Sequence, residues 1–239
     1  MTQFKFSKLA IEEHISQVGV DVRPIIEVRA ERQKLTDFGL WLTDKWPTLF
    51  ENVVQGPAAF FVTKKFVFPG KGEAELATFT LTQRGPIFIF PHKLGILPGE
   101  DIELPDRTEV VITALERFRQ TWPQCKQVRL GVVTIYTFDC APESPVGIMT
   151  TRFTRLRGSP SELMLQFNLP TDDHNRVIQL QQVVMLVIGA EPHQGIRVQL
   201  DFNNIAMDED LSKDQKLRIL HDADEFCRQD LFKILNAEE

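Results

Sequence analysis

Hydrophobic and polar residues alternate along several stretches of the chain, the pattern of a strand with one buried and one solvent-facing side. The clearest case runs from Ala77 to Thr82, where Ala, Phe and Leu alternate with Thr. Similar alternation is found over 128–138, 163–169 and 196–202. Because one-sided strands are typical of antiparallel sheets, we predict such a sheet.

Further apolar runs extend the predicted sheet to about nine strands. They cover 25–30, 60–68, 86–90, 148–156 and 177–188. The strands do not alternate regularly with helices, which argues against a doubly wound parallel fold. We therefore predict an α+β fold, with a mostly antiparallel sheet and three main helices packed largely on one face.

Three segments have the periodicity of amphipathic helices, about 3.6 residues. The first covers 36–54 and is expected to end or bend near Trp46, because Pro47 disfavours helical geometry in the residue before it. The second follows Asp106 and the third follows Ser212. Glu or Gln lies three residues after each of these, which is the spacing of a capping box.

The composition is that of a globular protein, with 43% hydrophobic and 25% charged residues in a chain of 239. We predict one α+β domain over 1–239, in which the acid-rich segment 204–239 is a possible C-terminal helical module. The longest apolar run, 183–190, is shorter than the roughly 20 residues of a membrane span. The N-terminus has no signal-peptide pattern, so a cytoplasmic location and no membrane partner are expected.

Charge and cysteine usage restrict the partners and cofactors. The net charge of −6 disfavours a nucleic-acid partner, because the molecule as a whole repels phosphate backbones. The three cysteines, Cys125, Cys140 and Cys227, have no C-x-x-C spacing. This argues against a disulfide framework and a structural zinc site and favours buried free thiols. No cofactor is predicted.

The group Arg152, Arg155 and Arg157 is the candidate ligand-binding site, since no acid lies between Ser144 and Ser161. Guanidinium groups suit phosphate and carboxylate recognition. On a regular strand Arg155 and Arg157 share a face, whereas Arg152 and Arg155 lie on opposite faces. Arginine that only solubilises a strand is the alternative interpretation.

A second candidate is the run Asp172, Asp173, His174, whose oxygen and imidazole groups can ligate a divalent cation. The favoured interpretation is a hairpin turn, because Asp and Asn bond to nearby backbone groups and the run separates two predicted strands. The metal site is kept as the weaker alternative.

No catalytic residue is assigned. The chain has no G-x-S-x-G, S-x-x-K or H-E-x-x-H motif, the local frames in which a nucleophile or metal would be recognised. His221 and Glu225 lie one helical turn apart and can act as an acid and its orienting group. Such pairs are also common on exposed helices without any function.

The order of elements resembles a sporadically distributed bacterial protein family of unknown function. The residues that carry the resemblance are the segment Pro24–Val28, a helix that ends at Trp46-Pro47, and the segment Val198–Asn203 before a final helix with Leu220-His221 and Phe226. The resemblance implies no activity, site or cofactor.

Three functions are compatible with these observations. The leading hypothesis is a non-catalytic binding or assembly protein that self-associates or takes a protein partner, because three helices cannot cover both faces of a broad sheet. The second is a small-ligand-binding protein or enzyme that acts on an anionic, phosphorylated compound near the arginines. The third is a nucleic-acid accessory protein, which the net charge disfavours.

Overall fold

The computed structural model describes residues 4–8, 11–68, 72–93, 105–154, 162–185 and 192–236. Its strands are β1 (Ile11–Arg23), β2 (Asn52–Gln55), β3 (Ala59–Phe68), β4 (Gly72–Thr82), β5 (Gly85–Lys93), β6 (Lys126–Asp139), β7 (Met164–Asn168), β8 (His174–Met185) and β9 (His193–Asn204). Its helices are α1 (Arg32–Lys45), α2 (Arg107–Thr121), α3 (Pro145–Phe153), α4 (Lys213–Gln229) and the short α5 (Leu231–Asn236).

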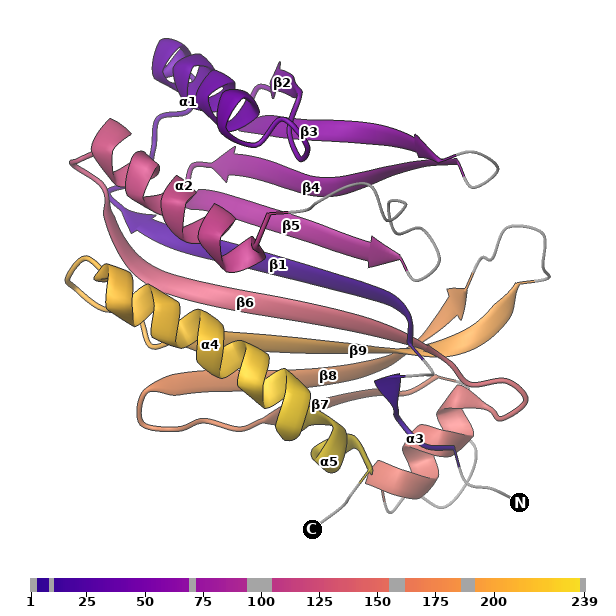
Figure 1. Ribbon diagram of the computed structural model, residues 1–239. Coiled ribbons are helices and arrows are strands. Elements are labelled where there is room, and N and C mark those ends of the chain that lie inside the picture. Colours follow the sequence, from indigo (N-terminus) through magenta and orange to yellow (C-terminus); the bar gives the residue numbers. More distant parts are fainter. Residues whose placement is uncertain are drawn as a thin grey trace.

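The strands that the structure describes form one antiparallel sheet in the order β2-β3-β4-β5-β1-β6-β9-β8-β7 (Figure 1). Helices α1, α2, α4 and α5 lie together on one face of this sheet. The predicted α+β fold, with an antiparallel sheet of about nine strands and its main helices on one face, is therefore confirmed.

The sheet consists of two topologically similar halves. The first runs β1–α1–β2–β3–β4–β5–α2 and the second β6–α3–β7–β8–β9–α4. In each half the first strand pairs with the last, β1 with β5 and β6 with β9. The halves meet where β1 pairs antiparallel with β6, with Gly19 opposite Gly131. An approximate two-fold relation between the halves follows from this arrangement.

The core lies between the sheet and the helices. Alternate residues of the central strands point to it, among them Val18 and Val20 of β1 and Leu130 and Val132 of β6. Helix α2 contributes an apolar stripe that ends in the fully buried Trp122. The apolar side chains of the alternating strands and of the amphipathic helices thus pack against each other in a single buried layer.

Both predicted capping boxes mark true helix starts. The Asp106 carboxylate accepts a hydrogen bond from the Glu109 backbone N–H at 2.9 Å. Ser212 and Gln215 form the complete box: the Ser212 hydroxyl accepts from the Gln215 N–H, and the Gln215 side chain accepts from the Ser212 N–H. These starts are predictable because the signal is confined to one helical turn.

Two predicted elements are wrong over part of their length or in their type. Helix α1 ends at Lys45 with Trp46 as its C-cap, as predicted, but the rest of the predicted helix 36–54 is wrong, because residues 52–55 pair with β3 as an edge strand. The segment 148–156 was expected to be a strand, but 145–153 is helix α3, capped by the Ser144 hydroxyl with Pro145 in its first turn. This Ser-Pro helix start outweighs the apolar alternation that follows it.

The predicted strand over residues 25–30 is also wrong. Residues 25–30 form turns rather than a strand, although Ile26 and Val28 are buried. The strand of this region is β1, which the sequence analysis did not include. Its signal is present, because Val18, Val20 and Val22 alternate with smaller or polar residues.

Candidate functional site

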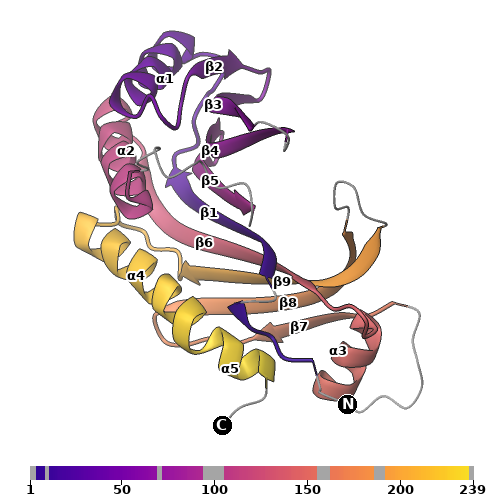
Figure 2. The same ribbon diagram turned by 45° about the vertical axis from the view of Figure 1, so that its right-hand side comes forward.

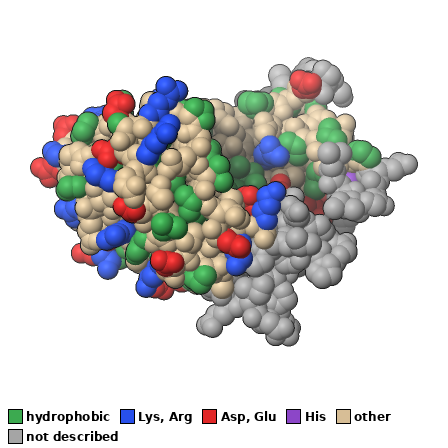
Figure 3. All heavy atoms as spheres, turned by 90° about the horizontal axis from the view of Figure 1, so that it is seen from above, with side chains coloured by type: hydrophobic (Ala, Val, Ile, Leu, Met, Phe, Trp, Pro, Cys, Tyr) green, Lys and Arg blue, Asp and Glu red, His purple; other side chains and the backbone are tan. Residues whose placement is uncertain are grey.

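The face of the sheet opposite the helices is concave (Figure 2). None of the helices that the structure describes lies on it, and Figure 3 shows a recess in the molecular surface. Because side chains alternate along each strand, the pairing register identifies the residues on this side. We call it the open face; its members include Glu13, Ile15, Gln17, Gly19, Asp21, Val54, Phe61, Thr78, Thr80, Ile87, Ile89, Arg129, Gly131, Val133, Ile135, Met164, Asn175, Val177, Gln179, Arg197, Gln199, Asp201 and Asn203.

The centre of the open face is a depression of about 250 Å³ at the junction of the two halves. Gly19 and Gly131 face each other there and place no side chain on the surface. Ile87 borders the glycine pair on the β5 side and Asn203 on the β9 side. The depression therefore exists because two neighbouring strands both carry glycine at the same level of the sheet.

A polar network borders one side of this depression. The Arg129 guanidinium donates from Nε to Asn203 Oδ1 at 3.2 Å and lies 3.6 Å from the Asp21 carboxylate. The Asn203 amide in turn donates to Asp201 Oδ1 at 2.9 Å. Positive and negative groups are thus balanced across this part of the face, which does not favour a polyanion.

Apolar side chains occupy both the centre and the two ends of the open face. Two of them border the depression and three continue along the same central strands; together they form what we call the aliphatic centre: Ile87 and Val133, then Ile15, Ile89 and Ile135. At the ends, Val54 and Phe61 are 52% and 37% exposed, and Met164 is 64% exposed. A surface with an apolar middle bordered by Thr, Gln and Asn has the composition of a protein-binding patch.

The structure places the Arg152 guanidinium among groups of the protein itself. The residue lies on α3 and donates hydrogen bonds to the backbone carbonyls of Phe4 and Leu235 and to the Asn236 side chain. Its guanidinium also stacks over the Phe6 ring, and burial lowers its pKa. Arg152 therefore ties α3 to both terminal segments. The predicted partners in the group, Arg155 and Arg157, lie outside the described residues.

The run Asp172, Asp173, His174 forms the turn between β7 and β8, where the Thr171 N–H donates to the His174 carbonyl at 2.8 Å. Asp173 lies 3.5 Å from the Arg218 guanidinium, and His174 Nε2 lies 3.9 Å from the Asp222 carboxylate.

Another cluster of possible metal ligands was found on α4. Among the described residues, one group of His, Cys, Asp or Glu brings its ligand atoms within 4.8 Å of one another: His221, Asp222 and Glu225. His221 and Glu225 are the pair that the sequence analysis considered for acid catalysis. Both are exposed, and Arg218 Nε lies 3.9 Å from Asp222, where it competes with any cation for this carboxylate.

His174 has a measurable consequence for stability. Burial against Phe202 and α4 lowers the pKa of His174, with Asp222 and Asp173 opposing that shift. The unfolded chain therefore binds a proton at this residue at a higher pH than the folded chain. Stability is then present above the ordinary value of 6.5 and is lost as the pH falls below it.

We expect the free energy of unfolding to fall less on acidification in His174→Gln than in wild type. Urea denaturation between about pH 7 and about pH 5 measures it, as the change in unfolding free energy over that interval. His221→Gln, which replaces a 75% exposed imidazole, is the matched control. An equal acid dependence in wild type and His174→Gln would contradict the assignment.

The open face could not be recognised as a site from the sequence, because its residues come from strands that are far apart along the chain.

Among the described residues, no helix is both long and apolar enough to cross a bilayer. The three cysteines are unpaired and buried, as expected. In comparisons with known proteins, no family model, no curated protein and no solved structure matches this chain.

Proposed function

We propose that the protein is a non-catalytic binding or assembly protein that associates with a second copy of itself through the open face. The observation that carries the proposal is the apolar surface of that face, which the described helices leave uncovered. Burial of apolar surface is the main driving force of association. The net charge and the balanced network around Arg129 disfavour a nucleic-acid partner.

The distribution of apolar groups supports a second copy as the partner. In a two-fold contact each surface is used twice, so a residue at the end of one copy meets a different region of the other. Here the exposed ends, Val54 and Phe61 on one side and Met164 on the other, flank the aliphatic centre. An end of one copy placed in the concave centre of the other covers both apolar regions at once.

Light scattering after size exclusion, at micromolar concentration, tests the proposal. We expect wild type to have twice the chain mass of 27.4 kDa and Phe61→Asp to have the mass of one chain. Leu40→Asp is the control, because Leu40 is also exposed, at 52%, but lies on α1. A single-chain mass for wild type, or equal effects of both substitutions, would contradict self-association. Circular dichroism confirms that each variant is folded.

A further inference from the structure

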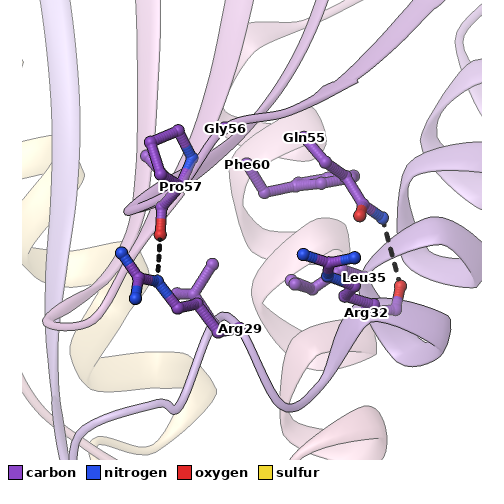
Figure 4. Close-up of a pocket in the computed structure, with 9 residues that line it drawn as sticks. Arg29, Arg32, Leu35, Gln55, Gly56, Pro57 and Phe60 are labelled. Atoms are coloured by element: carbon purple, nitrogen blue, oxygen red, sulfur yellow. Dashed lines mark hydrogen bonds between the residues drawn. The ribbon is translucent and has the colours of Figure 1, made fainter.

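A separate hollow lies at the β2 end of the molecule, outside the open face (Figure 4). It has a volume of about 450 Å³, within the range of small-molecule sites. The segment that leads into α1, the first turn of α1, and the turn between β2 and β3 enclose it. Pro57 and Ala59 supply accessible apolar groups above the buried Val28, Leu35 and Phe60, and Arg29, Arg32 and Gln55 supply polar groups.

Within the described residues neither arginine of the hollow forms an ion pair, and one of the two side chains is fixed by a hydrogen bond. Arg29 Nε donates to the Pro57 carbonyl at 2.8 Å, which fixes that side chain beside the β2–β3 turn. Arg32 makes no hydrogen bond through its guanidinium within the described part of the chain, and Figure 4 shows it extending into the hollow. No carboxylate of the described residues lies within 4.0 Å of either guanidinium.

Gln55 completes the arrangement. Its amide nitrogen donates to the Arg32 carbonyl at 3.2 Å and to the Thr36 hydroxyl at 2.8 Å. These bonds join the end of β2 to α1 and fix the position of the Arg32 backbone. Arg32 therefore projects from a fixed helix start, and Arg29 is held by its bond to the Pro57 carbonyl.

Charge and shape together define the ligand class. The chain as a whole is acidic, at −6, yet the described residues that line this hollow include two cations and no acid; the neighbouring Glu31 pairs with Lys34. Guanidinium groups bind carboxylate and phosphate oxygens in pairs, and an apolar floor binds hydrocarbon or aromatic surface. We propose that the hollow binds a small organic anion, with its anionic group on Arg32 and its apolar body against Pro57 and Ala59.

This hollow lies in the other half of the molecule from Arg152, Arg155 and Arg157 and is a separate candidate site for an anionic ligand. The inference is independent of self-association, because the hollow shares no residue with the aliphatic centre. Arg32→Gln leaves the oligomeric mass unchanged if both proposals hold, so either one can fail alone.

Titration calorimetry with phenyl phosphate and 3-phenylpropanoate tests the site, and inorganic phosphate and phenol serve as partial probes. We expect at least one of the two organic anions to bind, phosphate to bind more weakly, and phenol not to bind. Arg32→Gln should weaken binding by about tenfold or more, because it removes a charge-assisted pair. Amide resonances of Gly56 and Arg32 should shift on binding.

Lys213→Gln is the matched control, since it removes one positive charge at the exposed start of α4 and should leave the affinity unchanged. The Arg32 guanidinium makes no hydrogen bond within the described chain and the carbonyl that Gln55 binds is kept, so Arg32→Gln is expected to fold, and its melting temperature verifies this. The proposal is overturned if neither organic anion binds. It is equally overturned if Arg32→Gln and Lys213→Gln weaken binding alike, or if the shifts fall elsewhere.

Discussion

Replacing Arg152 with alanine is expected to lower the free energy of unfolding by about 2–4 kcal/mol. The guanidinium donates to the Phe4 and Leu235 carbonyls and to the Asn236 side chain, so one substitution removes three donated bonds; of these acceptors, Asn236 Oδ1 keeps the Phe6 N–H. Hydrogen bonds from charged donors are stronger than neutral ones, and an unsatisfied buried acceptor has its own cost. Urea denaturation followed by circular dichroism measures the loss.

Two further variants separate the possible causes. Arg152→Lys keeps the charge but not the planar fork, and we expect it to fall between wild type and alanine. Arg228→Ala removes a 71% exposed guanidinium paired with Asp224 and should have a small effect. If Arg152→Ala changed stability no more than Arg228→Ala, Arg152 would not be a structural link, and its original interpretation as a ligand-binding group would regain support.

Gly85→Ala is expected to destabilise the protein by about 3 kcal/mol or more. Gly85 has φ of +138°, a conformation that L side chains rarely adopt. A Cβ at this position would lie 2.0 Å from the Val20 carbonyl oxygen. That oxygen belongs to the backbone of the central strand β1, so the strand itself would have to move. Thermal and chemical denaturation measure the effect.

Gly19→Ala is the matched control, because both glycines border the central depression. A Cβ on Gly19 would have its nearest neighbour, Ile87 Cγ1, at 4.0 Å, an ordinary contact. We expect a change in stability within about 0.5 kcal/mol. Similar losses in both variants would show that the backbone at Gly85 is not the decisive constraint.

The parts of the fold that could be predicted are those with local signals. The Ala77–Thr82 alternation and the capping boxes at Asp106 and Ser212 each lie within a few residues, and the structure confirms them. The errors arose where two local signals compete. In α3 the Ser144-Pro145 start outweighs strand-like alternation, and after α1 the apolar residues of 52–55 belong to a strand rather than to the helix.

The candidate site could not be predicted because it depends on pairings between distant segments. Gly19 and Gly131 form a depression only because β1 and β6 pair in one particular register. The hollow at Arg29 and Arg32 requires the β2–β3 turn to fold back over the start of α1. The hydrogen bonds of Arg152 could not be predicted either, because its acceptors lie about 150 and 80 residues away in the sequence.

The antiparallel pairing of β1 with β6 has a consequence for how any partner is oriented. A partner segment that lies across the junction contacts two strands that run in opposite directions. The backbone alone therefore distinguishes little between that segment and the same segment turned end for end. The equivalence is broken by the flanks, where Ile87 stands on one side of the glycine pair and Asn203 on the other. A partner that places an apolar group against Ile87 and a hydrogen-bonding group against Asn203 therefore fits in only one of the two orientations.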